Sequence, residues 1–236
     1  YPVVTEKQKH QKGKANIYCF TDFMRSMLPE NEITVVGNGS ACVVGGQAYI
    51  IKKGQRFITN SAIASMGYDL PAAIGACISS GYKEVVNFTG DGSIQMNIQE
   101  LQTIISHRLP IKIFVVNNDG YHSIRQTQSN FFKGKLVGIG SDSGDLSFPD
   151  MKKIAYAYGF PYYCAASNRS IKTAVRKTLA TDGPVICEIF VDKNQRFEPK
   201  SATRRLDDGS LVSAPLEDLA PFLPEDELKK IMKVSD

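Results

Sequence analysis

Two polar motifs follow neighbouring apolar segments of this chain, and they constrain its fold more than any other feature. Residues 84–89 are predicted to form a buried strand that ends at Gly90-Asp91-Gly92-Ser93. Residues 95–108 predict a helix, and the next strand, over residues 111–117, ends at Asn117-Asn118. Parallel strands joined by a helix present their carboxyl ends at the same edge of a sheet, which is where open α/β sheets bind ligands.

Short β-branched runs alternate with helical stretches along most of the chain. The predicted strands cover residues 33–36, 57–59, 84–89, 111–117, 162–165 and 185–191. The predicted helices cover residues 15–28, a segment opening at Pro71, and residues 95–108, 150–158 and 170–180. This alternation is typical of a doubly wound sheet. We therefore predict an α/β fold with a six-stranded parallel sheet and helices on both faces.

The two ends of the chain depart from this pattern. Residues 1–14 are polar and rich in lysine, and we predict a linker from an upstream domain; residues 15–192 form the sheet domain. Residues 193–236 are first basic and then rich in proline, which predicts a C-terminal tail with short helical pieces. The tail is either a solvated connector with a helix packed on the domain, or a lid that brings positive charge to the ligand edge.

Composition fits one large globular domain and excludes several classes of partner. The chain has 236 residues, of which 42% are hydrophobic, so it can bury a sizeable core. The formal charge of +4 is modest and spread out, and no apolar stretch approaches the roughly 20 residues of a membrane span. We therefore expect no nucleic-acid or membrane partner.

The cysteines and the first residues suggest where the protein resides. The five cysteines show no CxxC spacing and mostly lie in apolar runs, which favours buried, reduced thiols over disulfides or zinc. No signal peptide opens the chain, so we expect a cytoplasmic protein. Tyr1 is not a natural first residue, which suggests a trimmed fragment.

The first pair of motifs offers the ligands that Mg²⁺ prefers. Mg²⁺ takes about six oxygen ligands near 2.1 Å, commonly one or two from side chains. Asp91 can supply an anionic oxygen, Asn118 a neutral one, and the carbonyl of Gly120 a third. The N–H groups of Gly92 and Ser93 precede a helix and can donate to phosphate oxygens. An ordinary turn and an ordinary strand end are the alternative, but both motifs following apolar strands favour a site for Mg²⁺ and a diphosphate.

A third glycine-rich segment ends the first predicted strand at the same edge. Within Gly37-Asn38-Gly39-Ser40, the flexible backbone can approach a terminal phosphate, and Asn38, Gly39 and Ser40 can contact it. A simple strand-to-helix turn is the alternative. The chain carries neither a P-loop lysine motif nor a Gly-x-Gly-x-x-Gly fingerprint, which counts against ATP and NAD.

These segments resemble a known family. Gly90-Asp91-Gly92-Ser93, residues 95–101 and Val116-Asn117-Asn118 are similar to the thiamine diphosphate motif of the acetolactate synthase-like enzymes. Residues 65–76 resemble the family's segment beneath the thiamine ring, and the whole resemblance runs from about Ile33 to Val191. It implies thiamine diphosphate and Mg²⁺ as cofactors, with this chain as the C-terminal, diphosphate-binding third of a longer enzyme.

The resemblance also implies roles for individual residues. Backbone groups of Ala64 and Met66 would bond the aminopyrimidine, the Met66 side chain would bend the cofactor, and Ser65 and Tyr121 would complete the binding segments. Core filling is the alternative for Met66. The segment Gly37-Asn38-Gly39-Ser40 departs from the Gln-His-Gln that the synthases carry there.

The implied reaction is decarboxylation of a 2-oxo acid such as pyruvate, with transfer of the acyl carbanion to a second carbonyl. The family takes its activating glutamate from a pyrimidine-binding domain of a second subunit, in a homodimer or homotetramer, and FAD would belong only to a central domain. We therefore expect the isolated chain to be inactive and assign no catalytic residue to it. His122 is a candidate for proton transfer, with a structural histidine as the alternative.

The acceptor and the activity itself stay open. Thr127 stands where the synthases carry a tryptophan, which leaves room for a bulkier acceptor such as a keto-sugar. A non-catalytic cofactor-binding or assembly domain is the alternative to an enzyme.

Overall fold

The computed structural model describes residues 3–201, 203–205, 208 and 210–232. The remaining ten positions belong to the predicted linker and tail, and these parts of the two predictions lie outside the described residues. The chain divides into two compact units, with the boundary between Gln195 and Arg196. Each unit is described by itself.

The first unit is built on one six-stranded sheet, as predicted. Its strands are β1 (Ile33–Val36), β2 (Arg56–Thr59), β3 (Val85–Gly90), β4 (Ile111–Asn117), β5 (Tyr162–Ala165) and β6 (Val185–Phe190). All of them pair in parallel, in the order β2-β1-β3-β4-β6-β5. The α/β fold class with a parallel sheet is confirmed.

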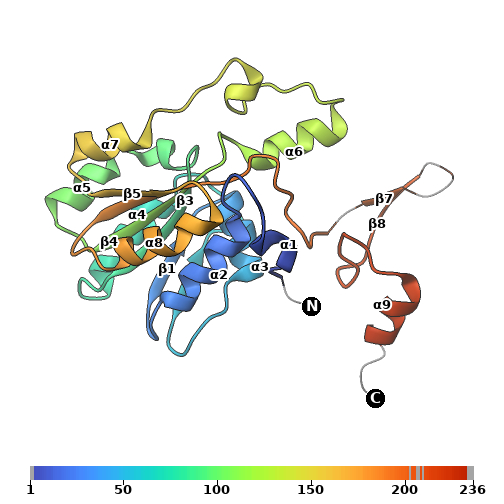
Figure 1. The fold of residues 1–236 in the computed structure, drawn as a ribbon, viewed down its shortest axis with the longest axis horizontal. Coiled ribbons are helices and arrows are strands. Elements are labelled where there is room, and N and C mark those ends of the chain that lie inside the picture. The colour runs from blue at the N-terminus through green and yellow to red at the C-terminus, as the bar shows by residue number, and fades with distance from the viewer. Residues whose placement is uncertain (1–2, 202, 206–207, 209, 233–236) are drawn as a thin grey trace. The chain divides into compact units, whose positions relative to one another are not determined.

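Helices cover both faces of this sheet (Figure 1). The helices of this unit are α1 (Glu6–Lys9), α2 (Ile17–Met27), α3 (Ser40–Ala48), α4 (Asp69–Ser79), α5 (Glu100–Ser106), α6 (His122–Phe131), α7 (Met151–Tyr158) and α8 (Asn168–Leu179), with the 3₁₀ turns η1 (Ile94–Asn97) and η2 (Ser141–Ser143). Helices α2, α3 and α8 pack together on one face, and α4, α5 and α7 pack on the other. The sheet is therefore doubly wound.

The central strands are apolar because neither of their faces meets water. Every residue of β1, and every residue of β3 and β4 but the last, is buried. On one face, Phe20 of α2 lies 5.4 Å, ring centre to ring centre, from both Phe88 and Phe114. The side chain of Asn16 caps α2 by accepting from the backbone N–H of Tyr18 (3.0 Å).

Two predicted helix boundaries are wrong. The helix predicted over residues 95–108 is divided into η1 and α5, and Nδ2 of Asn97 donates to the carbonyl of Gly67 (2.8 Å) at the division. This tertiary bond holds the first turn against another loop. The helix predicted to open at Pro71 begins at Asp69, because a proline anywhere in the first turn costs no helical hydrogen bond.

The second unit contains an antiparallel pair, β7 (Thr203–Arg205) and β8 (Leu211–Ser213), and the helix α9 (Glu225–Met232). The helix agrees with the short helical pieces expected in the tail, whereas the pair of strands stands where a connector was expected. Asp208-Gly209 was the overlooked signal, because this dipeptide commonly turns a hairpin. Between the two strands, Asp208 Oδ1 accepts from the backbone N–H of Ser210 (2.8 Å).

All five cysteines are described, and all carry free thiols. Cys77 and Cys187 are buried as expected, whereas Cys164 is exposed at the edge strand β5, so the expectation of burial is wrong there. No helix in the described part of the chain is both long and apolar enough to cross a membrane.

Candidate functional site

The predicted motifs meet where β1, β3 and β4 end. After β1 the chain crosses to the face that carries α3, whereas after β3 it crosses to the opposite face, which carries α5. The crossovers therefore diverge between β1 and β3, and such a switch point opens a crevice at the carboxyl edge of the sheet.

A pocket of about 160 Å³ lies at this edge. It is lined by Asn38, Gly39, Ser40, Met66, Gly90, Asp91, Gly92, Ser93, Asn118, Gly120, Tyr121, His122, Ser123 and Ile124. The structure thus brings together all of the predicted cofactor-binding residues except Ala64 and Ser65. Those two lie in the exposed loop before Gly67, outside the pocket lining.

Asp91 is the buried anion of the pocket, with only 5% of its surface exposed. Its Oδ1 accepts from the backbone N–H of Gly92 and its Oδ2 from that of Gly120, both at 2.9 Å. Burial raises the pKa of the carboxyl group to about 7, although the two N–H groups oppose this shift. A buried carboxylate whose charge is this costly is stabilised by a bound cation.

Asn118 is oriented across the pocket by the segment after β1. Its Nδ2 donates to Oγ of Ser40 (2.7 Å), so the amide oxygen is the atom left to meet a cation. The carbonyl of Gly120 accepts from the N–H of His122 (3.0 Å) and retains a second lone pair. Carboxylate, amide and carbonyl oxygens form a donor set suited to Mg²⁺, so the residues present fit the ion that the fold family implies.

Gly120 must be glycine for this loop to form. Its φ is +121°, and a Cβ atom built there would lie 1.9 Å from the carbonyl oxygen of Ile139. A Cβ atom on Gly140 would likewise lie 2.1 Å from the carbonyl oxygen of Asp119. The N–H of Tyr121 donates to Ile139 (2.8 Å), so two backbone segments pack directly against each other.

The loop that carries Met66 is tied to the segment after Asp91. The N–H of Gly67 donates to Oγ of Ser93 (2.9 Å), and its carbonyl accepts from Asn97. Met66 is 38% exposed beside the pocket, an exposure that core filling does not explain. Ala64 has a positive φ of 57°, so the chain turns sharply just before Met66.

Gly92, a predicted phosphate ligand, and His122, a candidate for proton transfer, make contacts that the sequence did not predict. The N–H of Gly92, expected to serve a phosphate, donates to Asp91 instead. The His122 ring is buried beside the backbone of Gln195 and Lys193, which acts to raise its pKa, while burial lowers the pKa more strongly. These contacts favour the structural interpretation of His122.

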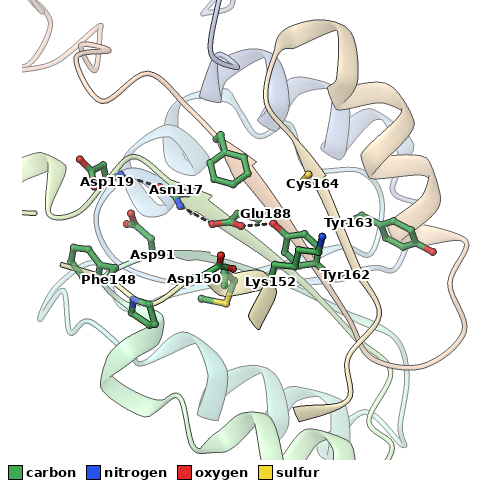
Figure 2. A pocket seen from close by; sticks show the side chains of 13 residues that line it. Asp91, Asn117, Asp119, Phe148, Asp150, Lys152, Tyr162, Tyr163, Cys164 and Glu188 are labelled. Atoms are coloured by element: carbon green, nitrogen blue, oxygen red, sulfur yellow. Dashed lines mark hydrogen bonds between the residues drawn. The ribbon is translucent and has the colours of Figure 1, made fainter. Parts of the chain in front are cut away.

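A larger cavity of about 760 Å³ lies on the other side of Asp91, towards β5 and β6 (Figure 2). Glu188 lies at its floor, where its carboxylate accepts from Nδ2 of Asn117 (2.6 Å) and from the hydroxyl of Tyr162 (2.5 Å). Sequence reasoning missed Glu188, although one acidic residue within an otherwise apolar strand was a visible signal.

Comparison with known proteins matches this site. The family model described as "Thiamine pyrophosphate enzyme, C-terminal TPP binding domain" matches residues 37–189. Acetolactate synthase 2, chloroplastic, of Nicotiana tabacum is 32% identical over 195 residues, which cover 76% of this chain and 29% of that protein. The acetolactate synthase large subunit of Cyanidium caldarium is 33% identical over 147 residues, 62% of this chain and 25% of that protein.

The chain therefore spans less than a third of the length of these relatives. The matched residues begin directly after β1 and include the ends of β3 and β4, and thus the segments that carry Asp91 and Asn118. The chain belongs to the thiamine pyrophosphate enzymes and carries their C-terminal TPP-binding domain.

Proposed function

We propose that this chain holds thiamine diphosphate through Mg²⁺, as the C-terminal module of an acetolactate synthase-like carboligase. The observation that carries the proposal is the pocket in which Asp91, Asn118 and Gly120 converge at the switch point of the sheet. The similarity to acetolactate synthases over most of the chain supports the class of reaction.

One set of pocket residues would bind the metal ion, and another would bind the diphosphate. Asp91, Asn118 and the Gly120 carbonyl would hold Mg²⁺, and Asn38, Gly39, Ser40 and Ser93 lie where they can contact the diphosphate. Gly92 fixes the Asp91 carboxylate through its N–H (2.9 Å). Met66, at the mouth of the pocket, would touch the organic part of the cofactor and keep it bent.

When bound, thiamine diphosphate supplies the electron sink for decarboxylating a 2-oxo acid, for which we propose pyruvate. The residues of this chain bind and orient the cofactor and bury its charged end. A pyrimidine-binding domain, from a second subunit in a homodimer or homotetramer, would complete the site. We propose an acceptor bulkier than 2-oxobutyrate because Thr127 stands in the place of a tryptophan.

A binding titration tests the proposal. In the protein that carries this chain, calorimetry should show thiamine diphosphate binding in the presence of Mg²⁺ and loss of that binding in EDTA. The physical reason is that the oxygens of Asp91, Asn118 and Gly120 would repel the oxygens of a diphosphate unless a cation lay between them. Binding of equal strength in EDTA would contradict the proposed metal site.

A further inference from the structure

Arg125 lies on α6 and is buried directly behind the pocket, with 4% of its surface exposed. Its guanidinium group donates from Nη1 to the carbonyl of Asn118 (3.0 Å) and from Nη2 to the carbonyl of Asp119 (2.8 Å). The planar guanidinium group of an arginine presents its N–H donors in a fixed geometry, whereas the donors of a lysine ammonium converge on one flexible atom. One side chain thus fixes two successive peptide groups of the loop that bears Asn118.

The loop needs such a donor because its backbone is irregular. Asp119 and Gly120 have positive φ values of 59° and 121°, so the carbonyls before them cannot continue the β4 ladder. A buried carbonyl left without a donor lowers the stability of the folded loop. With both carbonyls held by Arg125, the next N–H, that of Gly120, reaches Oδ2 of Asp91 (2.9 Å).

The charge of Arg125 is balanced from the segment that packs over the loop. Oδ2 of Asp142, in η2, lies 3.7 Å from Nε of Arg125. Lys193 pairs with Asp142 as well and lies 3.9 Å from Oδ2 of Asp119. The guanidinium group therefore contacts the carbonyls of the loop on one side and the Asp142 carboxylate of η2 on another.

We propose that Arg125 is a positioning residue for the cation site, acting through the backbone of residues 118–120. Ser40 holds the Asn118 amide from the other side (2.7 Å), so the backbone and side chain of that ligand are fixed independently. Arg125 itself does not line the pocket. This inference rests on the proposed function, because it assumes that Asp91 and Asn118 bind Mg²⁺.

The test is the Mg²⁺ dependence of thiamine diphosphate binding in Arg125→Lys and Arg125→Met, made in the protein that carries this chain. Loss of a residue that orients a metal ligand typically costs about 10–100-fold in metal affinity. We expect the half-saturating Mg²⁺ concentration to rise by about tenfold in Arg125→Lys and further in Arg125→Met, with cofactor affinity largely restored at saturating Mg²⁺. Arg169→Met, an exposed arginine on α8, is the matched control and should leave the Mg²⁺ titration unchanged.

The outcomes separate this inference from the proposed function. If the unsubstituted protein binds no thiamine diphosphate with Mg²⁺, the proposed function fails and the inference fails with it. If that protein binds but Arg125→Lys keeps the original Mg²⁺ dependence, the inference alone is overturned. The metal-free thermal midpoint is measured in parallel. Loss of the fold in both variants, or a weakened cofactor affinity that excess Mg²⁺ does not restore, would show a purely structural role and overturn it.

Discussion

Asp91 and Asn118 hold the same ligand edge but contribute differently to it. Asp91 is an anion buried between two N–H donors, whereas Asn118 is a neutral amide held by Ser40. A cation near Asp91 would relieve the cost of burying its charge, which is the cause of its raised pKa. The two residues are therefore unequal partners in the proposed metal site.

Asp91→Ala should abolish Mg²⁺-dependent cofactor binding, and Asn118→Ala should weaken it strongly. The first substitution removes both a ligand and the charge that attracts the ion, while the second removes only a ligand. Calorimetric titration of thiamine diphosphate at several Mg²⁺ concentrations measures both effects. An unchanged affinity in Asp91→Ala would show that the metal, if any, binds elsewhere.

Glu32, just before β1, makes the stability of the fold depend on pH. Burial, with a smaller contribution from the negative charge of Glu84, raises the pKa of Glu32 from 4.5 to about 7. Between these values the unfolded chain releases the proton that the folded chain retains. The free energy of unfolding should therefore fall as the pH rises from 4.5 to about 7, and this contribution should be constant above that range.

Glu32→Gln should remove this fall and stabilise the chain by roughly 1–3 kcal/mol at pH 8, because an amide carries no charge to bury. Urea denaturation at a series of pH values measures it. Glu30→Gln, at an exposed position nearby, should keep the pH dependence of the unsubstituted chain. A pH profile of Glu32→Gln that parallels the parent would contradict the assignment.

At the scale of elements, Phe20 of α2 makes aromatic contacts with two strands of the sheet. Phe20 is fully buried between Phe88 of β3 and Phe114 of β4. Phe20→Ala should lower the free energy of unfolding by about 3–5 kcal/mol, since the helix and sheet cannot close over the space left behind. The matched control is Phe131→Ala on α6, where the ring is 71% exposed and the loss should be small. Equal losses in urea denaturation would mean that Phe20 is not an anchor.

The elements that the sequence predicted well are those whose signal is local. The central strands β3 and β4 are mostly apolar runs because helices cover both sheet faces, and they end at glycine or asparagine. The division between η1 and α5 depends instead on the bond from Asn97 to Gly67, thirty positions away. Such a contact leaves no pattern in the segment itself.

The same distinction holds for the candidate site. Asp91, Asn118 and Gly120 were predictable because each follows a strand in the chain and strand ends share one edge of the sheet. Arg125 was not predictable, because a charged residue within the polar helix α6 ordinarily faces water. Only the left-handed backbone at Asp119 and Gly120 turns two carbonyls towards it, and that geometry emerges with the tertiary fold.

At the scale of the whole molecule, we propose that this chain provides the diphosphate and metal site and that another domain provides the pyrimidine site. The chain spans less than a third of its acetolactate synthase relatives, and we propose that the activating glutamate belongs to a pyrimidine-binding domain. The 236-residue chain alone, given thiamine diphosphate and Mg²⁺, should therefore release no carbon dioxide from pyruvate. The full protein that carries it should do so. Release of carbon dioxide by the isolated chain would contradict the proposal that a second domain is required.

The most direct test of the account is to locate the cation itself. Crystals of the protein that carries this chain, grown with thiamine diphosphate and Mn²⁺ in place of Mg²⁺, would reveal the ion by its anomalous scattering. The account predicts a single peak within coordinating distance of Asp91, Asn118 Oδ1 and the Gly120 carbonyl, in contact with the diphosphate. A diphosphate bound at this edge without a cation between it and Asp91, or an ion bound at another place, would contradict it.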